Sequence, residues 1–158
     1  MKRIAQAAFL TLALASGPAF CHGDDGSHGG KSAHGAEIGK PGDATKVSRT
    51  IAVEMNDSMH FNPSRITIKQ GDTIRFLVTN RGRLKHELVL GSVTELKTHA
   101  ELMRKFPEME HVDPNMVSVE PGKTGELLWQ FTKTGKVNFA CLRPGHFEAG
   151  MRGSVSVK

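Results

Sequence analysis

Cysteine is scarce in this chain, which has only two in 158 residues. Cys21 lies at the end of an N-terminal segment with the features of an export signal, so Cys141 is the one thiol expected to remain if that segment is cleaved after Cys21. Exported proteins enter an oxidising compartment, where paired cysteines usually form disulfides. A lone cysteine with histidine and methionine nearby is better explained as a metal ligand than as half of a disulfide.

Long hydrophobic runs are also absent. The apolar run at residues 4–15 is shorter than the roughly 20 residues that a membrane-spanning helix needs. It follows two basic residues and precedes small ones, which is the pattern of a secretory signal peptide over residues 1–21. Cleavage after Ala19 and cleavage after Cys21 both fit, the second leaving His22 first, whereas lipoprotein processing fits less well. We therefore expect a periplasmic protein with no membrane insertion of the mature chain.

Strong charge of either sign is missing as well. The formal net charge is +5 and falls to +3 once the two basic residues of the signal are removed. No basic stretch is interleaved with aromatic residues, so a nucleic-acid-binding function is not expected. The length that remains corresponds to one domain and a tail.

The period of the apolar residues changes along the chain. Residues 22–46 have almost no apolar side chains to bury and predict a disordered tail rich in His, Gly and Asp. From residue 47 onwards, apolar and polar residues alternate, which predicts half-buried strands. The strands are expected near residues 51–55, 65–69, 72–80, 86–90, 116–119, 125–131, 136–141 and 154–157.

One helix interrupts these strands. Thr94 is predicted to cap a helix over residues 95–106, and Pro107 to end it. Seven or eight short strands with frequent turns predict an all-β antiparallel sandwich over residues 47–158, with a short helical insertion.

The most informative motif is a short loop near the C-terminus that contains Cys141, His146 and Met151, with His86 upstream. Two imidazoles, a thiolate and a thioether are the ligands of a type 1 copper site, a trigonal His₂Cys plane with a weak axial Met. Each residue alone fits a simpler interpretation: a buried Cys, a surface His or a core Met. The four together, in an exported β-domain, favour a copper site that passes single electrons.

With these motifs, residues 47–158 resemble the cupredoxins, which carry Cys-x4-His-x4-Met near the C-terminus and an upstream histidine, here in Lys85-His86-Glu87. Residues 55–63, 71–76 and 143–151 add to the resemblance. With its His-rich leader, the chain is most similar to the small periplasmic CopI-type copper-tolerance cupredoxins. The resemblance implies a cupredoxin-like Greek-key β-sandwich and copper, as Cu(I) or Cu(II), at the four residues of the motif.

One position departs from the resemblance. Many electron-transfer cupredoxins have Asn or Ser after the first histidine, and the side chain of that residue ties the ligand loops together. This chain has Glu87 at that position instead. The change affects the groups around the ligands and leaves a blue and a green site both open. Leu142, Pro144 and Phe147 are expected to form an apolar rim around an exposed edge of His146, which in the wider family serves electron exchange.

Further histidines and methionines suggest secondary copper sites. The helical insertion and the segment after it carry His99, Met103, Met109, His111 and Met116. Thioethers select Cu(I), although methionines also fill gaps in a core. In the tail, His22, His28 and His34 recur every six residues, a spacing at which a flexible chain closes around Cu(II) at low entropic cost; a plain solvated linker is the alternative.

Two functions are compatible with these features. The first is copper tolerance or homeostasis, in which the protein binds copper and exchanges electrons or copper with a periplasmic redox or copper-transport partner. The second is a soluble periplasmic electron carrier, which needs neither the His-rich tail nor the insertion. An enzyme is not expected, because the chain has one domain's length and no set of His-x-His pairs for a multinuclear centre.

Overall fold

The computed structural model describes residues 38–109 and 111–158. The predicted signal peptide (1–21) and the tail histidines His22, His28 and His34 lie outside the described residues. The described residues all belong to one compact unit.

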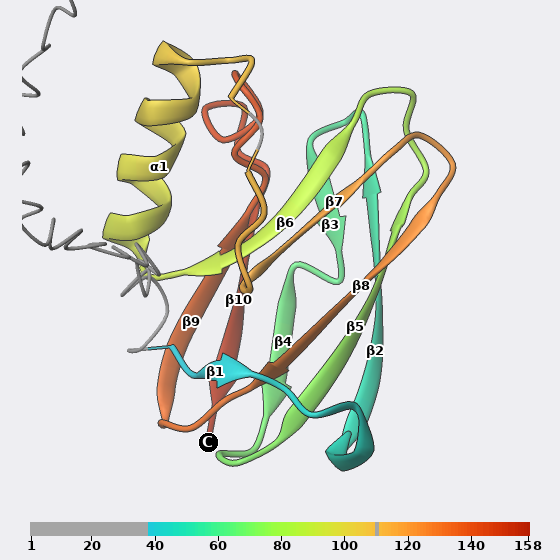
Figure 1. The fold of residues 1–158 in the computed structure, drawn as a ribbon, viewed down its shortest axis with the longest axis vertical. Coiled ribbons are helices and arrows are strands. Elements are labelled where there is room, and N and C mark those ends of the chain that lie inside the picture. Colours follow the sequence, from blue (N-terminus) through green and yellow to red (C-terminus); the bar gives the residue numbers. More distant parts are fainter. Residues whose placement is uncertain (1–37, 110) are drawn as a thin grey trace, which may run out of the picture. The chain divides into compact units, whose positions relative to one another are not determined.

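Two five-stranded sheets form the domain (Figure 1). In spatial order, the first contains β1 (Lys40–Pro41), β8 (Thr124–Gln130), β5 (Thr73–Asn80), β2 (Arg49–Asn56) and β3 (His60–Asn62). The second contains β4 (Arg65–Ile68), β10 (Arg152–Val157), β9 (Gly135–Ala140), β6 (His86–Gly91) and β7 (Met116–Val119). The predicted all-β sandwich is confirmed. It is mixed rather than purely antiparallel, because β2 pairs with β5 and β4 with β10 in parallel.

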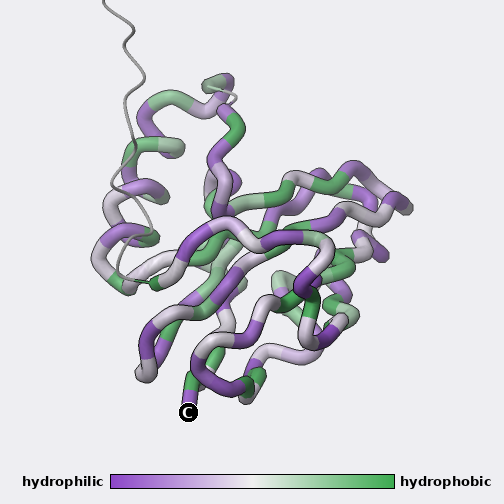
Figure 2. Tube along the Cα trace, turned by 60° about the horizontal axis from the view of Figure 1, so that its bottom comes forward, coloured by the Kyte–Doolittle hydropathy of each residue, from purple (hydrophilic) through white to green (hydrophobic). Residues whose placement is uncertain are grey.

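Period-two alternation builds the core between the sheets. In β2 the side chains of Ile51, Val53 and Met55 are buried while their neighbours face outward. Figure 2 shows the same alternation of hydrophobic and hydrophilic residues along other strands. Phe76 on β5 and Trp129 on β8, in the same sheet, are also buried, and each such side chain contributes about 1.5–3 kcal/mol through burial.

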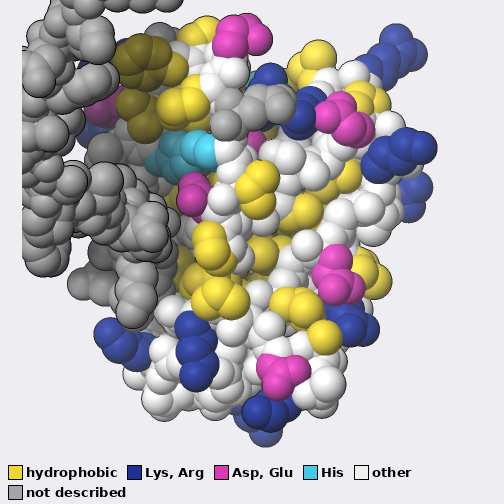
Figure 3. Space-filling model, viewed as in Figure 1, with side chains coloured by type: hydrophobic (Ala, Val, Ile, Leu, Met, Phe, Trp, Pro, Cys, Tyr) yellow, Lys and Arg dark blue, Asp and Glu magenta, His cyan; other side chains and the backbone are white. Residues whose placement is uncertain are grey.

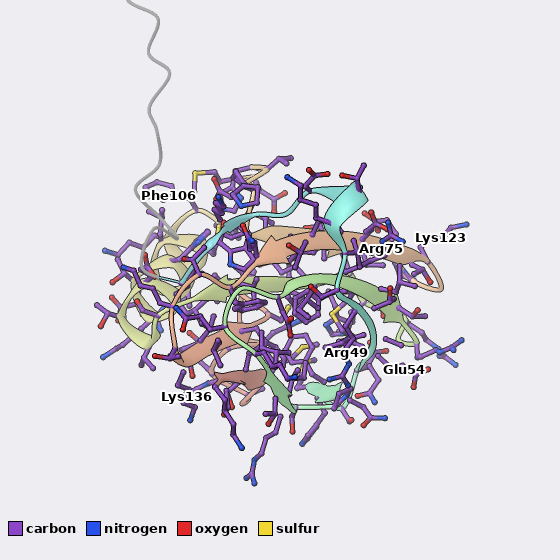
Figure 4. All side chains as sticks on the ribbon, turned by 90° about the horizontal axis from the view of Figure 1, so that it is seen from below. Arg49, Glu54, Arg75, Phe106, Lys123 and Lys136 are labelled. Atoms are coloured by element: carbon purple, nitrogen blue, oxygen red, sulfur yellow. The ribbon has the colours of Figure 1, made fainter. Side chains whose placement is uncertain are left out.

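The outer face of the first sheet is polar. Arg75 on β5 forms an ion pair with Glu126 on β8 at 3.2 Å. Arg49, Glu54 and Arg75 lie on the side of the domain away from Phe106, which follows the helix (Figure 4).

The helical insertion is α1 (Val93–Lys105), which lies beside β6 and β9 (Figure 1). It begins two residues earlier than predicted, because Ser92 and not Thr94 is the N-cap. The Ser92 Oγ accepts from the Glu95 N–H, and the Glu95 carboxylate accepts from the Ser92 N–H, which satisfies two backbone donors at once. The helix ends before Pro107, as predicted. Among the described residues no helix has the length and apolar character to cross a membrane.

Part of the segment assigned to the tail is structured. Of residues 22–46, the structure describes 38–46, in which β1 pairs with β8 and residues 44–46 form a 3₁₀ turn. Ile38 is buried, and its carbonyl accepts a 3.1 Å hydrogen bond from the Trp129 indole N–H. The described part of the structured domain therefore extends back to Ile38, ahead of the Val47 boundary that periodicity indicated.

Candidate metal centre

The loop between β9 and β10 brings three predicted ligands together. Cys141 follows the last residue of β9, and its N–H donates to the carbonyl of Met151 at 3.1 Å. The Met151 N–H donates in turn to the carbonyl of His146, also at 3.1 Å. Gly145 and Gly150 have φ values of 85° and 94°, a left-handed conformation that glycine adopts without steric cost. The loop is therefore closed by its own backbone.

The fourth residue arrives from a neighbouring strand of the same sheet. His86 is the first residue of β6, which pairs with β9. The Sγ atom of Cys141 lies 4.0 Å from Nδ1 of His86 and 3.3 Å from Nδ1 of His146. The donor atoms of these three residues all lie within 4.8 Å of one another. Met151 is fully buried in the same core cluster as Cys141.

Asp57 is a member of this site that the sequence did not reveal. Its Oδ1 lies 3.1 Å from Nε2 of His86, and its carboxylate also accepts the N–H groups of Arg83 (2.7 Å) and Leu84 (3.2 Å). The Arg83 bond is the main reason that the pKa of Asp57 is lowered. Because Nε2 of His86 faces a carboxylate, Nδ1 is the nitrogen left for a metal, as in carboxylate–histidine–metal triads.

Glu87 ties the ligand segments together in a way the sequence only suggested. The side chain is buried, and its Oε1 accepts the Leu142 N–H at 3.0 Å. The Ser118 hydroxyl lies 3.4 Å from the other carboxylate oxygen. Burial raises the pKa of Glu87. Glu87 thus provides the connection that the resemblance assigns to Asn or Ser at this position.

The surroundings of Cys141 and His146 disfavour the charged form of both side chains when no metal is bound. Burial, followed by the nearby Glu87 charge, raises the pKa of the Cys141 thiol to about 12. Burial and the neighbouring His86 lower the pKa of His146. A soft cation would therefore displace the thiol proton, and the lowered pKa of His146 favours the neutral imidazole that a metal ion needs. Thiolate, imidazole and thioether donors in this environment fit a copper ion.

The predicted apolar rim is only partly correct. Leu142 is 1% exposed and belongs to the core beneath the loop, so it cannot line the surface. Phe147 is half-buried, and the Arg152 guanidinium lies 4.1 Å from its ring centre. Pro144 is exposed and His146 is half-buried, so part of His146 is accessible to solvent.

The predicted secondary residues of the insertion fall into two groups. Met103 is buried, and Met109 and Met116 pack against the same small core cluster. These three methionines line a pocket of about 210 Å³ together with His111. The rings of His99 and His111 are in contact, with centroids 4.6 Å apart, and the carboxylate of Asp113, which the sequence analysis did not single out, joins them.

Comparisons with known proteins agree with this geometry. Residues 47–158 match the family described as copper binding proteins, plastocyanin/azurin family. The copper-resistant cuproprotein CopI of Rubrivivax gelatinosus is 51% identical over 139 residues, which cover 87% of this chain and 84% of that protein. The protein of the same name from Pseudomonas aeruginosa is 37% identical over 155 residues, which cover 80% of this chain and 85% of that protein.

Solved structures show the same fold at lower identity. Auracyanin B superposes with a TM-score of 0.61 at 20% identity, covering 78% of this chain and 99% of its own. Reduced auracyanin from Roseiflexus castenholzii gives a TM-score of 0.60 at 18% identity, and the match covers 71% of this chain and 98% of the auracyanin chain.

Proposed function

The chain belongs to the plastocyanin/azurin family of copper-binding proteins, together with the CopI cuproproteins, and on this basis we propose that it is a periplasmic copper-tolerance protein. Its cofactor is copper. In this proposal His86, Cys141, His146 and Met151 hold the copper ion, and residues 1–21 direct export. Copper resistance is the role named for the relatives, and the proposal extends it to this chain.

One observation carries the assignment of the site. A buried thiol lies 3.3 and 4.0 Å from Nδ1 atoms of two histidines that the chain brings from separate strands and loops. Buried polar groups are normally satisfied by hydrogen bonds, and here the thiol is within hydrogen-bond range of His146 but at the limit of that range from His86. A cation placed among the three atoms would satisfy all of them, because each offers a lone pair once the thiol proton leaves.

The surrounding residues suit such a role. Bound copper supplies a one-electron redox couple. Asp57 orients His86, Glu87 fixes the backbone at Leu142, and burial keeps bulk water from Cys141. Ligands that are held by their neighbours resist rearrangement, so the protein part of the site changes little between oxidation states.

A soluble electron carrier is the second candidate. The half-buried ring of His146 and the exposed Pro144 beside it favour it, because they offer a short path from the site to a partner surface. The His-rich tail and the His- and Met-containing insertion favour copper handling, since a simple carrier needs neither. Both functions are non-enzymatic.

A spectrum of the purified mature protein with one equivalent of Cu(II) tests the site. We expect intense thiolate-to-copper absorption in the visible region and the EPR signal of a His₂Cys site, both lost in Cys141→Ser. His60→Gln, which removes an exposed histidine of β3, is the matched control and keeps both signals. A weak ligand-field band alone would place the bound Cu(II) elsewhere in the chain.

A gene deletion in the source organism separates the two functions. Copper tolerance predicts a strain that is sensitive to copper but respires normally, and that is rescued by the native gene and not by Cys141→Ser. A respiratory defect at low copper would instead support the electron carrier.

A further inference from the structure

A second group of metal-binding side chains lies on the helical insertion, outside the Cys141 site. His99 is on α1, and His111 and Asp113 are in the segment that follows the helix. One donor atom from each lies within 4.8 Å of the other two. Figure 3 shows histidine side chains gathered at the surface beside α1, with an acidic side chain next to them. Apart from the Cys141 site, this is the one such group among the described residues.

The two segments that carry these side chains are both anchored. Leu96, Ala100 and Met103 hold the inner face of α1 against the second sheet. The segment after the helix is fixed at Asn115, whose side chain donates to the Leu90 carbonyl at 2.6 Å and whose carbonyl accepts the Leu90 N–H at 2.9 Å. The three donors are therefore positioned by the fold before any ligand binds.

The arrangement of the nitrogen atoms suits a proton or a metal ion shared between the two rings. The Nε2 atoms of His99 and His111 face one another, so two lone pairs meet unless a proton or a metal ion lies between them. The Nδ1 atom of His111 is buried and has no hydrogen-bond partner among the described residues. The carboxylate of Asp113 adds a negative charge at the same point.

The donor set and its surroundings determine which ion fits. His99, His111 and Asp113 line a pocket of about 450 Å³ that is also lined by Leu96 and Leu102. The pocket gives an ion a route of entry and leaves room for a further ligand such as water. Two imidazoles and one carboxylate suit Zn(II) and Cu(II), and at equal geometry Cu(II) binds more tightly.

We infer that His99, His111 and Asp113 form a second metal site, which takes a divalent cation of the Cu(II) and Zn(II) type. This inference does not depend on the Cys141 centre, because the two sites share no ligand and use different donor atoms. His111 lines the pocket of this site and also the separate pocket of Met103, Met109 and Met116. The methionine thioethers therefore neighbour one of the proposed ligands, His111.

The test uses the full mature chain with two sets of competing ligands disabled. Cys141→Ser and His146→Gln together disable the first centre, and His22→Ser, His28→Ser and His34→Ser remove the tail histidines. We expect this protein to bind one equivalent of Cu(II), with nitrogen hyperfine structure in the EPR spectrum, and to bind Zn(II) more weakly. His99→Gln or His111→Gln in this background is expected to weaken Cu(II) binding by about 100-fold or more. Removing a residue that only hydrogen-bonds to a metal ligand already lowers metal affinity by about 10- to 100-fold.

Matched variants make the result decisive. Asp113→Asn keeps the shape of the side chain and is expected to weaken binding, whereas His60→Gln is expected to leave it unchanged. Far-UV circular dichroism and the metal-free melting temperature show whether each variant is folded. Absence of stoichiometric Cu(II) binding in the folded background overturns the inference. So does binding that is insensitive to His99→Gln and Asp113→Asn, or that is lost in Met103→Leu and Met116→Leu instead.

Discussion

The buried carboxylate of Glu87 accepts the backbone N–H of Leu142 at 3.0 Å, joining β6 to the start of the loop that carries the proposed copper ligands. Each residue directly follows a proposed ligand, His86 and Cys141 respectively. A single hydrogen bond therefore fixes the spacing between two ligand backbones. The carboxylate does this at a cost, because burial raises its pKa.

Glu87→Gln is expected to flatten the pH dependence of stability of the metal-free protein. The ordinary pKa of 4.5 is raised in the folded state, so above pH 4.5 the unfolded chain loses its proton first and the native protein loses stability as pH rises. Glutamine keeps an acceptor for the Leu142 N–H without the charge. Urea unfolding of both proteins from pH 4 upward should show a difference that grows with pH until the raised pKa is passed.

Glu87→Ala is the contrasting variant. It leaves the buried Leu142 N–H without an acceptor, which costs about 1–3 kcal/mol. Parallel stability curves for the native protein and Glu87→Gln would contradict the proposed cause of the pKa shift.

Asp57→Ala is expected to lower copper affinity by about 10- to 100-fold, the usual effect of removing the partner of a ligating histidine. The reason is that Nε2 of His86 loses the carboxylate that orients the ring. Asp57→Asn retains an oxygen acceptor and should have a smaller effect. Competition titration against a chelator measures both. Glu54→Gln removes the same charge from a half-exposed site on β2 and should match the native protein; an equal loss there would show a general charge effect.

Copper binding is expected to release one proton from Cys141 over most of the pH range. The metal-free thiol has a pKa of about 12, and the pKa of His146 lies below its usual 6.5. Between about pH 7 and 10 the thiol is therefore protonated without metal and ionised with it. The apparent affinity should rise about tenfold per pH unit. Calorimetry in buffers of different ionisation enthalpy counts the protons directly, and a pH-independent affinity would exclude Cys141 as a ligand.

Removal of residues 1–46 is expected to destabilise the domain, whereas removal of residues 1–37 is not. The longer deletion takes away Ile38 and β1, which cover Trp129 and accept its indole N–H. Loss of one buried isoleucine and one hydrogen bond amounts to about 2–4 kcal/mol. Trp129 is the only tryptophan, so its fluorescence should shift to the red in the longer deletion. Equal stability of the two would return the domain boundary to Val47.

Much of the strand pattern was predictable because it is local. Ile51, Val53 and Met55 are buried in the phase that their alternation indicated. The position of the helix cap was not, since Ser92 and Thr94 are both good N-cap residues. Glu95 decided between them, because its side chain reaches the Ser92 N–H.

The sequence by itself determined the donor types and the compact order of Cys141, His146 and Met151, because one short loop contains all three. Tertiary structure decided which distant groups meet them. Asp57 reaches His86 across 29 positions, and Ile38 reaches Trp129 across 91. Such contacts depend on strand pairing between segments far apart in the chain, and local periodicity carries no information about that pairing. The meeting of His99, His111 and Asp113 has a different origin, because these residues lie on two neighbouring segments, each of which the fold anchors so that the side chains converge.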